Sequence, residues 1–436
     1  MKINCTSDGA CDSVVTGGMG LHERLAGAGN TESTPSPLVP DFSLRPYEIY
    51  RGDALETVRR LTAGGIQFDT VFTSPPFFKL RNYGNDAREI GRERGEAGVG
   101  SFVSTLVSIF KNIPLRPWAS VWVNLGDKRG PNKELQGVPE RFVIAMQDAR
   151  FFLVDRVVWA KEVVKVDGTA FGHCMVEPAP GRLNGNGWEH LFRFTLDPSK
   201  AWSDACAIQI PRDFERFYHE GTETRVEQHP YSTAMNCVTS QEGRIPPNVW
   251  YVNTSRNGKT HYAAMPRELV ERPVAMTCPE WLVDDGGGIT PRTRIVEQTV
   301  YSEGARTFIT VYGQFSHWQE LHPHESTGND TESAKLEALR GRSGRNDSAR
   351  RYVPRYPRTV GWTHMDKPVV GSGIVLDPFG GTGTTGEVAV LLGRRFVGID
   401  LYQEYADRMA MRCAEAFENR AASKESNTSY TVDSLT

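Results

Sequence analysis

Short apolar runs, separated by polar turns and helix-like stretches, mark the ordered part of the chain. Three of them, Tyr47–Tyr50, Phe68–Phe72 and Ala119–Leu125, are too short for helices and are typical of buried strands. Residues 101–110 and 138–149 instead have the patterns of helices that pack on a sheet. The alternation of strands and helices is typical of an α/β fold, in which helices pack on an open sheet.

A glycine-rich turn lies between two strands near the end of the chain. The strand at 374–377 leads into the pattern GxGxxG, made by Gly381, Gly383 and Gly386. The next strand ends at Asp400. Glycines let a ligand approach the backbone closely, and a carboxylate at a strand end binds a ribose diol. We therefore expect an adenosine-containing cofactor at this turn.

A dinucleotide fits this turn less well than a sulfonium compound does. The turn belongs to the last strand–helix–strand unit of the chain, whereas a full dinucleotide site needs a second mononucleotide half after it. Asp377 and Phe379 also place a carboxylate and an aromatic ring ahead of the turn. That pair favours a cationic sulfonium over a pyrophosphate.

The segment Thr73–Phe77, with the sequence TSPPF, directly follows the second apolar run. Two successive prolines cannot continue a central strand or start a helix there, so the backbone leaves the sheet as a stiff loop. The loop holds the Ser74 hydroxyl, the Pro75 carbonyl and the Phe77 ring where open α/β sheets bind their ligands. An ordinary proline-rich turn would have the same local sequence, and only the rest of the chain favours a binding loop.

Composition limits the compartment and the charge available for partners. The 436 residues carry a formal net charge of -3, so any contact with nucleic acid must come from local patches. The seven cysteines include no CxxC pair, which argues against a disulfide framework and fits a reducing cytoplasm. We expect no metal site. No apolar stretch approaches the roughly 20 residues that span a bilayer.

One local patch is basic. Residues 335–358 contain eight Lys or Arg residues against two acidic ones, with tyrosines interleaved. Arginine and aromatic side chains together suit phosphate contact and base stacking, and a solvated linker is an equally good interpretation. The candidate DNA-binding residues of this segment are Arg340, Arg342, Arg345, Arg350 and Arg351.

Two motifs carry a resemblance to a known family. TSPPF at 73–77 and DPFGGTGTT at 377–385 resemble the DNA amino-methyltransferases that use S-adenosylmethionine, and their order resembles the β-type arrangement of that family. Residues 122–127, 159–161 and 261–270 resemble further family segments. The resemblance implies an α/β fold with a circularly permuted, Rossmann-like methyltransferase sheet that is mostly parallel, has helices on both faces and carries inserted recognition segments.

The resemblance also implies roles for individual residues. The implied catalytic residues are Ser74, Pro75, Pro76 and Phe77. The implied cofactor-binding residues are Asp53, Thr73, His261, Asp377, Phe379, Gly380, Gly381, Thr382, Gly383, Thr384, Thr385 and Asp400. Asp53 resembles the acid that contacts adenine in the family, and it would serve equally well as a helix N-cap.

The same resemblance divides the chain. It implies a catalytic domain at 45–160, 246–280 and 372–418, with a candidate target-recognition region at 161–245. Residues 281–371 form an insertion that holds the basic segment and a strand hairpin at 294–300 and 307–312. We expect residues 1–44 and 419–436 to be a disordered arm and tail.

The implied reaction is methyl transfer to the exocyclic amine of a base flipped out of double-stranded DNA. Ser74 Oγ and the Pro75 carbonyl would accept the two N–H bonds of the amine, and Phe77 would stack on the ring. Serine at the first loop position favours N4 of cytosine, with N6 of adenine as the alternative. Because the chain has no Pro-Cys dipeptide, we do not expect C5 methylation of cytosine.

Other interpretations remain open at this point. A catalytically inactive DNA-binding protein on the same scaffold is one, and a methyltransferase acting on RNA or on protein amines is another. The expected partner is double-stranded DNA, with a cognate restriction nuclease as a further candidate. We expect a cytoplasmic protein, either a monomer or a homodimer, that does not act at a membrane.

Overall fold

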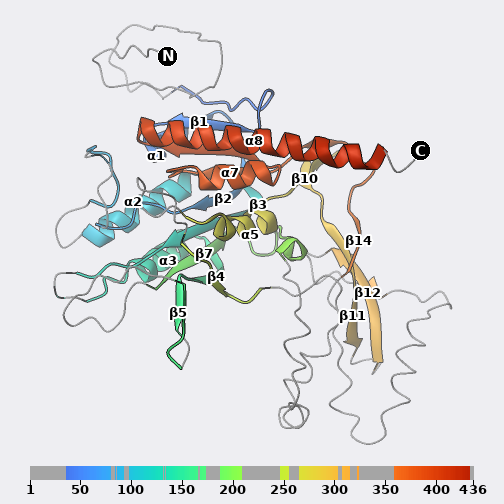
Figure 1. Cartoon of the computed structure of the whole chain (residues 1–436), viewed down its shortest axis with the longest axis horizontal. Helices are drawn as coiled ribbons and strands as arrows, with labels where there is room; N and C mark the ends of the chain where they lie inside the picture. Colours follow the sequence, from blue (N-terminus) through green and yellow to red (C-terminus); the bar gives the residue numbers. More distant parts are fainter. Residues whose placement is uncertain are drawn as a thin grey trace, which may run out of the picture. The chain divides into compact units, whose positions relative to one another are not determined.

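A computed structural model describes residues 36–79, 84, 86–92, 98–130, 132, 134–164, 167–172, 187–208, 246–254, 265–302, 307–314, 322–323 and 358–432 (Figure 1). By its internal contacts the chain divides into two compact units. The first comprises residues 1–202, 248–282 and 371–436, and the second comprises residues 203–247 and 283–370. No helix among the described residues is long and apolar enough to cross a membrane.

The first unit is built around one large sheet with the strand order β1-β17-β16-β2-β3-β7-β4-β8. Each described pair of neighbouring strands is parallel, apart from the two pairs that β7 makes. The predicted mostly parallel α/β sheet is therefore confirmed. The strands are β1 (Tyr47–Arg51), β2 (Phe68–Thr73), β3 (Leu115–Leu125), β4 (Phe152–Ala160), β7 (Trp188–Thr195), β8 (Val249–Tyr251), β16 (Ile374–Asp377) and β17 (Arg395–Asp400).

Strands β2 and β16 are neighbours in this sheet although they come from opposite ends of the chain. Val375 pairs with Thr70 and Leu376 with Val71, in parallel. Because both strands end at the same edge, the loop after β2 and the glycine-rich turn after β16 start side by side. This pairing joins the two motifs that carry the family resemblance.

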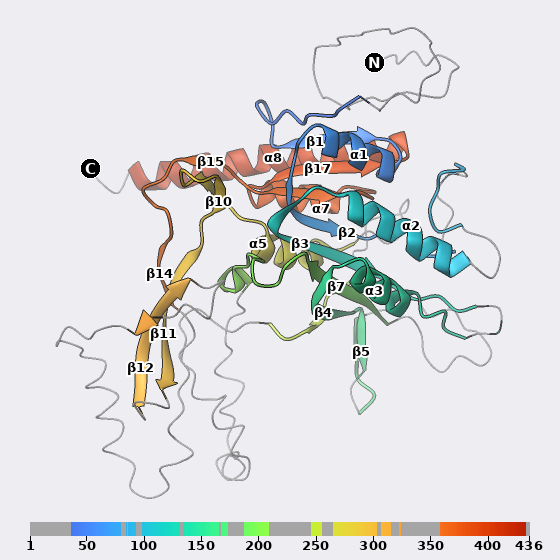
Figure 2. The same ribbon diagram turned by 180° about the vertical axis from the view of Figure 1, so that it is seen from behind.

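Helices cover both faces of the sheet. On one face α2 packs between α1 and α3, and their apolar side chains form a core with the strands (Figure 2). On the other face α7 packs between α5 and α8 (Figure 1). The helices are α1 (Ala54–Ala63), α2 (Gly98–Asn112), α3 (Val138–Asp148), α5 (Arg267–Thr277), α7 (Thr384–Leu391) and α8 (Gln403–Val432).

Local chemistry explains where the helices next to the strand ends begin. Asp53 caps α1, since its Oδ1 accepts a hydrogen bond from Glu56 N at 2.9 Å. Helix α3 starts after Gly137, which has a φ of 64° and whose N–H donates to Asp127 Oδ2 at 3.0 Å. Helix α7 starts after Gly383, which has a φ of 86°. Glycine adopts these left-handed conformations without the strain that a Cβ would cause.

The two predicted disordered ends require correction. Helix α8 does not end near residue 418 but continues to Val432. Residues 419–432 contain no proline or glycine and include Ala421, Ala422 and Lys424, which are good helix formers. At the other end, the described residues 36–44 are held to α1, where Leu38 N donates to Arg60 O at 3.0 Å. The remainder of the predicted arm, residues 1–35, lies outside the described part of the chain.

The region 161–245 also differs from the prediction. Its strand β7 lies within the main sheet, antiparallel to both β3 and β4, with Leu125 opposite His190. Two short strands that follow β4, β5 (Glu162–Val164) and β6 (Ala170–Gly172), form a separate hairpin. Part of the predicted recognition region therefore belongs to the catalytic sheet.

The second unit has its own antiparallel sheet, in the order β13-β12-β11-β14. Its central pair confirms the predicted hairpin, with Ile295 opposite Gln314 and Ser302 opposite Thr307. Arg294 in this unit forms a salt bridge with Asp204 at 2.7 Å. The strands are β11 (Arg294–Ser302), β12 (Thr307–Gln314), β13 (His322–Pro323) and β14 (Arg358–Trp362), and the remaining described elements are η1 (Ala205–Ile208), β9 (Leu282–Asp284), β10 (Ile289–Pro291) and β15 (Val369–Gly371).

Candidate functional site

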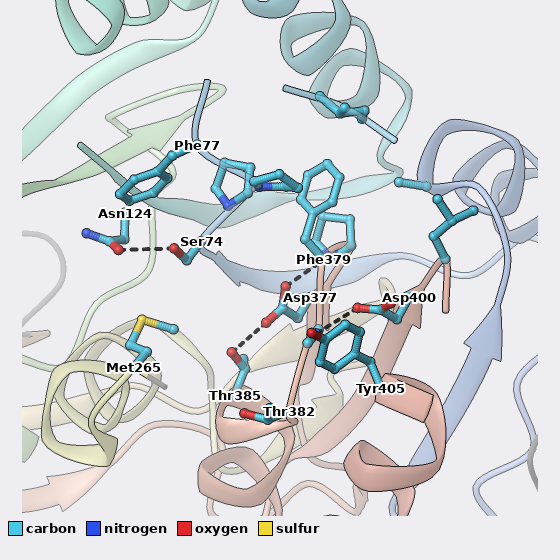
Figure 3. A pocket seen from close by; sticks show the side chains of 18 of the residues that line it. Ser74, Phe77, Asn124, Met265, Asp377, Phe379, Thr382, Thr385, Asp400 and Tyr405 are labelled. Carbon is cyan, nitrogen blue, oxygen red and sulfur yellow. Dashed lines mark hydrogen bonds between the residues drawn. The ribbon is translucent and has the colours of Figure 1, made fainter. Parts of the chain in front are cut away.

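One pocket in the first unit lies at the carboxyl ends of the strands. The sequence-predicted residues that line it are Asp53, Ser74, Pro75, Pro76, Phe77, Asp377, Phe379, Gly380, Gly381, Thr382, Thr384, Thr385 and Asp400. Figure 3 shows Ser74, Phe77 and Asn124 toward one end of the pocket, and Asp377 and Asp400 toward the other. We call the first end, with Trp159, Lys161 and Glu189, the loop half, and the second end, with Asp53, Phe379 and Gly381, the turn half.

Ser74 in the loop half is oriented by an asparagine. Ser74 Oγ donates to Asn124 Oδ1 at 3.1 Å, and Asn124 Nδ2 donates to the His190 carbonyl at 3.0 Å (Figure 3). Because the amide nitrogen bonds a carbonyl, the amide oxygen must face Ser74, and that oxygen can only accept. The Ser74 hydroxyl hydrogen is therefore committed to Asn124, and its lone pairs remain available as acceptors.

Phe77 packs against the strand end beside this serine. A Cβ built on Gly126 would lie 2.8 Å from Phe77 Cε2 and 3.4 Å from Glu189 Cγ. Real Cβ atoms do not approach a ring carbon that closely, so a side chain at residue 126 would displace the Phe77 ring. The glycine after β3 thus lets the ring and the Glu189 side chain lie beside the same stretch of backbone.

Asp377 is the structural centre of the turn half. Its Oδ1 accepts from Thr73 Oγ1 at 2.6 Å and from Phe379 N at 3.1 Å, and its Oδ2 accepts from Thr385 Oγ1 at 2.6 Å. Burial raises the pKa of this carboxyl to about 6, against the lowering effect of these three donors. One side chain therefore ties the end of β2, the glycine-rich turn and the start of α7 together.

Thr73 and Gly383, both predicted to bind cofactor, are not among the described residues that line the pocket. Thr73 is fully buried and donates to Asp377, from a position 304 residues away in the sequence. A Cβ on Gly383 would lie 2.7 Å from Met409 Cα, so this glycine lets the turn pack against α8. Both residues therefore hold the backbone of the site in place. His261 and the five candidate DNA-binding arginines lie outside the described part of the chain.

Asp400, at the end of β17, is the second carboxyl of the turn half. Its Oδ2 accepts from Gly381 N and its Oδ1 from Tyr402 N, each at 2.9 Å. Burial raises its pKa to about 6, and the nearby charge of Asp377 adds to the increase. A carboxylate offers about four lone-pair sites. Asp400 can therefore accept hydrogen bonds from a ligand while it holds the turn.

The turn half fits an adenosine-containing ligand. A Cβ on Gly381 would meet only the Phe379 carbonyl oxygen, at 3.9 Å, so no described protein group fills the space beside this glycine. Gly381 also has a φ of 50°, which favours glycine. Asp53 lines the same space while it caps α1 through Oδ1, so the N-cap and ligand-binding interpretations are compatible.

Several lining residues had no role assigned from the sequence. Asn124 and Lys161 lie in stretches that resemble the family, but their functions and that of Glu189 depend on contacts between β3, β4 and β7. Tyr402 Oη donates to Glu89 at 3.1 Å and accepts from Asp86 N at 3.2 Å. These contacts join distant segments, and no local signal predicts them. The other unassigned lining residues include Arg88, Trp159, Met265 and Tyr405.

Comparisons with known proteins identify the family to which the chain belongs. A family model described as DNA methylase, of the N6/N4 methyltransferase type, matches residues 68–289 and 363–412, which is more than half of the chain. The chain is 26% identical over 424 residues to the Type II methyltransferase M.SfiI of Streptomyces fimbriatus, covering 86% of this chain and 91% of the relative. It is 27% identical over 259 residues to the Type II methyltransferase M.Cfr9I of Citrobacter freundii, covering 52% and 72%.

A solved structure, the PvuII DNA methyltransferase (cytosine-N4-specific), aligns with a TM-score of 0.42 and 16% identity, covering 86% of this chain and 92% of that one. The match to the family model is what decides the assignment. The loop after β2 precedes the glycine-rich turn after β16, as in the β-type order that the sequence predicted. The chain belongs to the DNA methylase family and is a β-type amino-methyltransferase of the N6-adenine/N4-cytosine class.

Proposed function

We propose that this enzyme methylates the N4 amino group of a cytosine flipped out of double-stranded DNA, with S-adenosylmethionine as the methyl donor. The observation that carries the proposal is the hydrogen bond from Ser74 Oγ to Asn124 Oδ1. It leaves a neutral acceptor at the head of a rigid loop, in the same pocket as the turn half.

An exocyclic amine is a poor nucleophile because its lone pair is delocalised into the ring. Ser74 Oγ and the Pro75 carbonyl accept its two N–H bonds and draw the nitrogen toward tetrahedral geometry. Phe77 stacks on the flipped ring. Holding the nucleophile in line with the methyl group accounts for most of the rate.

The turn half holds the cofactor. When bound, S-adenosylmethionine supplies an electrophilic methyl group on a sulfonium. Asp400 accepts hydrogen bonds from the ribose hydroxyls, and Asp53 accepts one from the adenine amine. Gly381 lets the ligand approach the backbone, where a side chain would fill the space.

The amine gains a methyl group and must lose a proton. Ser74 already donates its hydroxyl hydrogen, and Asn124 is an amide, so neither residue is a base at neutral pH. The nitrogen is cationic once it is methylated, and its proton is then acidic enough to leave to water. This chemistry needs alignment of the amine, and it needs no strong base in the loop half.

The choice of base rests on the length and charge of the acceptor. The Ser74 side chain is shorter than Asp or Asn, the residues at this loop position that would resemble adenine enzymes. Asn124 behind it is uncharged, so Ser74 Oγ and the Pro75 carbonyl present two neutral acceptors to the amine. The shorter acceptor at the first loop position favours the N4 amine of cytosine.

Nucleoside analysis tests the proposal. DNA is incubated with the enzyme and labelled cofactor, digested to nucleosides and separated. We expect the label in N4-methylcytosine, and label in N6-methyladenine would overturn the choice of base. Cofactor-independent DNA binding with no labelled nucleoside would instead support an inactive scaffold.

We also propose that the segment at 335–358 contacts the DNA backbone, supported by its excess of basic residues. Deleting it should weaken DNA binding about tenfold and reduce the dependence of affinity on salt, because fewer counterions are released. An unchanged salt slope would make the segment a linker. The cognate restriction nuclease and the monomeric or homodimeric state that the sequence suggested stay predictions.

A further inference from the structure

We propose that Lys161, held by Glu189, donates hydrogen bonds to the ring acceptors N3 and O2 of the flipped cytosine and thereby determines base specificity. This inference rests on the proposed function. It assigns a binding role to an ion pair that the methyl-transfer chemistry above does not use.

The sheet topology places this ion pair in the loop half. Lys161 directly follows β4, and Glu189 lies on β7 opposite Trp159. Both side chains line the pocket together with Ser74 and Phe77. Glu189 Cγ also lies beside Gly126, the glycine against which the Phe77 ring packs. Glu189 of the pair therefore lies beside the Phe77 ring that is proposed to stack on the base.

Two adjacent residues of β7 position both Ser74 and the ion pair. Asn124 is anchored on the His190 carbonyl, and Glu189 is the preceding residue of β7. A shift of β7 would move both together. The acceptor for the exocyclic amine and the cation for the ring edge are thus positioned by the same backbone.

The ion pair is costly to bury, and its place on a pocket wall argues for a ligand. Lys161 Nζ bonds Glu189 Oε1, and their side chains are only 15% and 14% exposed. Removing two such charges from water offsets most of their attraction, so a buried pair is weak evidence for stability. The Trp159 ring, with its centroid 4.7 Å from Nζ, adds a cation–π contact that orients the ammonium.

Lys161 retains capacity to donate. An ammonium has three N–H donors and no acceptor. Glu189 takes one of them, and among the described residues no second acceptor is bonded to Nζ. The remaining donors lie on a side chain that lines the pocket, where an acceptor-rich ligand edge would satisfy them.

The ring edge of cytosine next to its amine offers more acceptors to the Lys161 ammonium than the corresponding edge of adenine does. Next to its amine, cytosine presents the two adjacent acceptors N3 and O2. Adenine presents one acceptor, N1, followed by a C–H group. A lone cation at N3 or O2 would draw electron density from the amine and lower its nucleophilicity. The Glu189 carboxylate offsets that effect, so the pair binds the ring edge with little loss of reactivity.

A substrate-analogue cycle tests the inference. Wild-type enzyme and Lys161→Met are given duplexes whose target is cytosine, 3-deazacytosine (a carbon at position 3) or 2-thiocytosine (a weaker acceptor at position 2), under single-turnover conditions. Both analogues change the intrinsic reactivity of the amine equally for the two enzymes. The comparison of the two enzymes therefore isolates the contact.

We expect wild-type enzyme to discriminate against at least one analogue about tenfold more strongly than Lys161→Met does, because the analogue leaves a donor unpaired only in the wild type. Equal discrimination by both enzymes against both analogues would overturn the inference. Glu189→Gln, which keeps a hydrogen-bond acceptor for Lys161, should show an intermediate loss of discrimination.

Two controls separate this role from general damage. Lys200→Met removes an exposed lysine paired with Asp197 outside the pocket and should leave rate and discrimination unchanged. Lys161→Met should keep wild-type affinity for S-adenosylmethionine, since the turn half is intact. If wild-type enzyme makes N4-methylcytosine but Lys161→Met discriminates equally well, only this inference fails. N6-methyladenine from the wild type would overturn the proposed function and this inference together.

Discussion

The two halves of the pocket use opposite electrostatic devices. In the loop half, the groups proposed to hold the reacting amine are neutral, namely the Ser74 hydroxyl, the Pro75 carbonyl and the Asn124 amide behind them. In the turn half, two buried carboxyls, Asp377 and Asp400, hold the backbone, and burial raises the pKa of each to about 6. The groups proposed to align the amine thus do not titrate, whereas the carboxyls of the half proposed to bind cofactor titrate near neutrality.

The comparison predicts that changes in one half affect catalysis while changes in the other affect binding. Ser74→Ala should give the largest effect, a fall of about 100-fold in the single-turnover rate, similar to removing one preorganised hydrogen bond at other reacting centres. Cofactor affinity should stay within about twofold of the wild-type value, because alanine removes no group of the turn half. Rates come from rapid-quench methylation assays and affinities from calorimetric titration.

Ser104, an exposed serine on α2, supplies the matched control. Ser104→Ala should change neither quantity. An equal loss of rate and cofactor affinity in Ser74→Ala would mean that the two halves do not act separately.

Asp400→Ala should show the converse pattern. We expect cofactor affinity to fall about 30-fold, since hydrogen bonds to a charged acceptor contribute about 1.5–3 kcal/mol. Loss of the bonds to Gly381 N and Tyr402 N contributes to the fall. The rate at saturating cofactor should change much less. Calorimetric titration measures the affinity, and unchanged affinity would refute the ribose-binding role. Asp407→Ala, at an exposed position on α8, is the matched control.

Asn124→Ala should lower the rate about tenfold without changing cofactor affinity. The variant keeps the Ser74 hydroxyl but frees its hydrogen, so the lone pairs are no longer directed by a fixed bond. If Asn124 acts only through Ser74, the Ser74→Ala/Asn124→Ala double variant should be no slower than Ser74→Ala alone. Additive losses would show that Asn124 has a separate role, and thermal unfolding of each variant controls for lost stability.

The halves also differ in how far the sequence predicts them. The Ser74–Phe77 loop and the turn after Asp377 could be predicted because proline and glycine fix their local backbone conformations. Asn124 could not be assigned, because its role depends on the insertion of β7 beside β3. Only that long-range pairing brings the His190 carbonyl within 3.0 Å of the Asn124 amide.

Two differences from the sequence predictions have equally physical reasons. The resemblance implied that Thr73 binds cofactor, but the side chain of this last residue of β2 is fully buried and donates to Asp377. The polar composition of residues 419–432 suggested a tail, although its helix propensity allows α8 to continue. Local composition therefore predicted the backbone of the site better than the direction of its side chains.

The smallest predicted effect concerns pH. The carboxylate form of Asp400 is the form proposed to accept hydrogen bonds from ribose, so cofactor affinity should rise as the pH passes upward through about 6. A group with a pKa of about 6 is roughly half ionised at pH 6 and nine-tenths ionised at pH 7, which predicts a rise in affinity of about twofold. The contribution of Asp400 to folding has the opposite sign. Its folded pKa lies above the unfolded value of 3.8, so its contribution to the free energy of unfolding decreases between about pH 4 and 6. Calorimetric titrations at pH 6 and pH 7 measure the affinity change, which Asp400→Ala should abolish, whereas a pH step that persists in that variant would move the titration to Asp377.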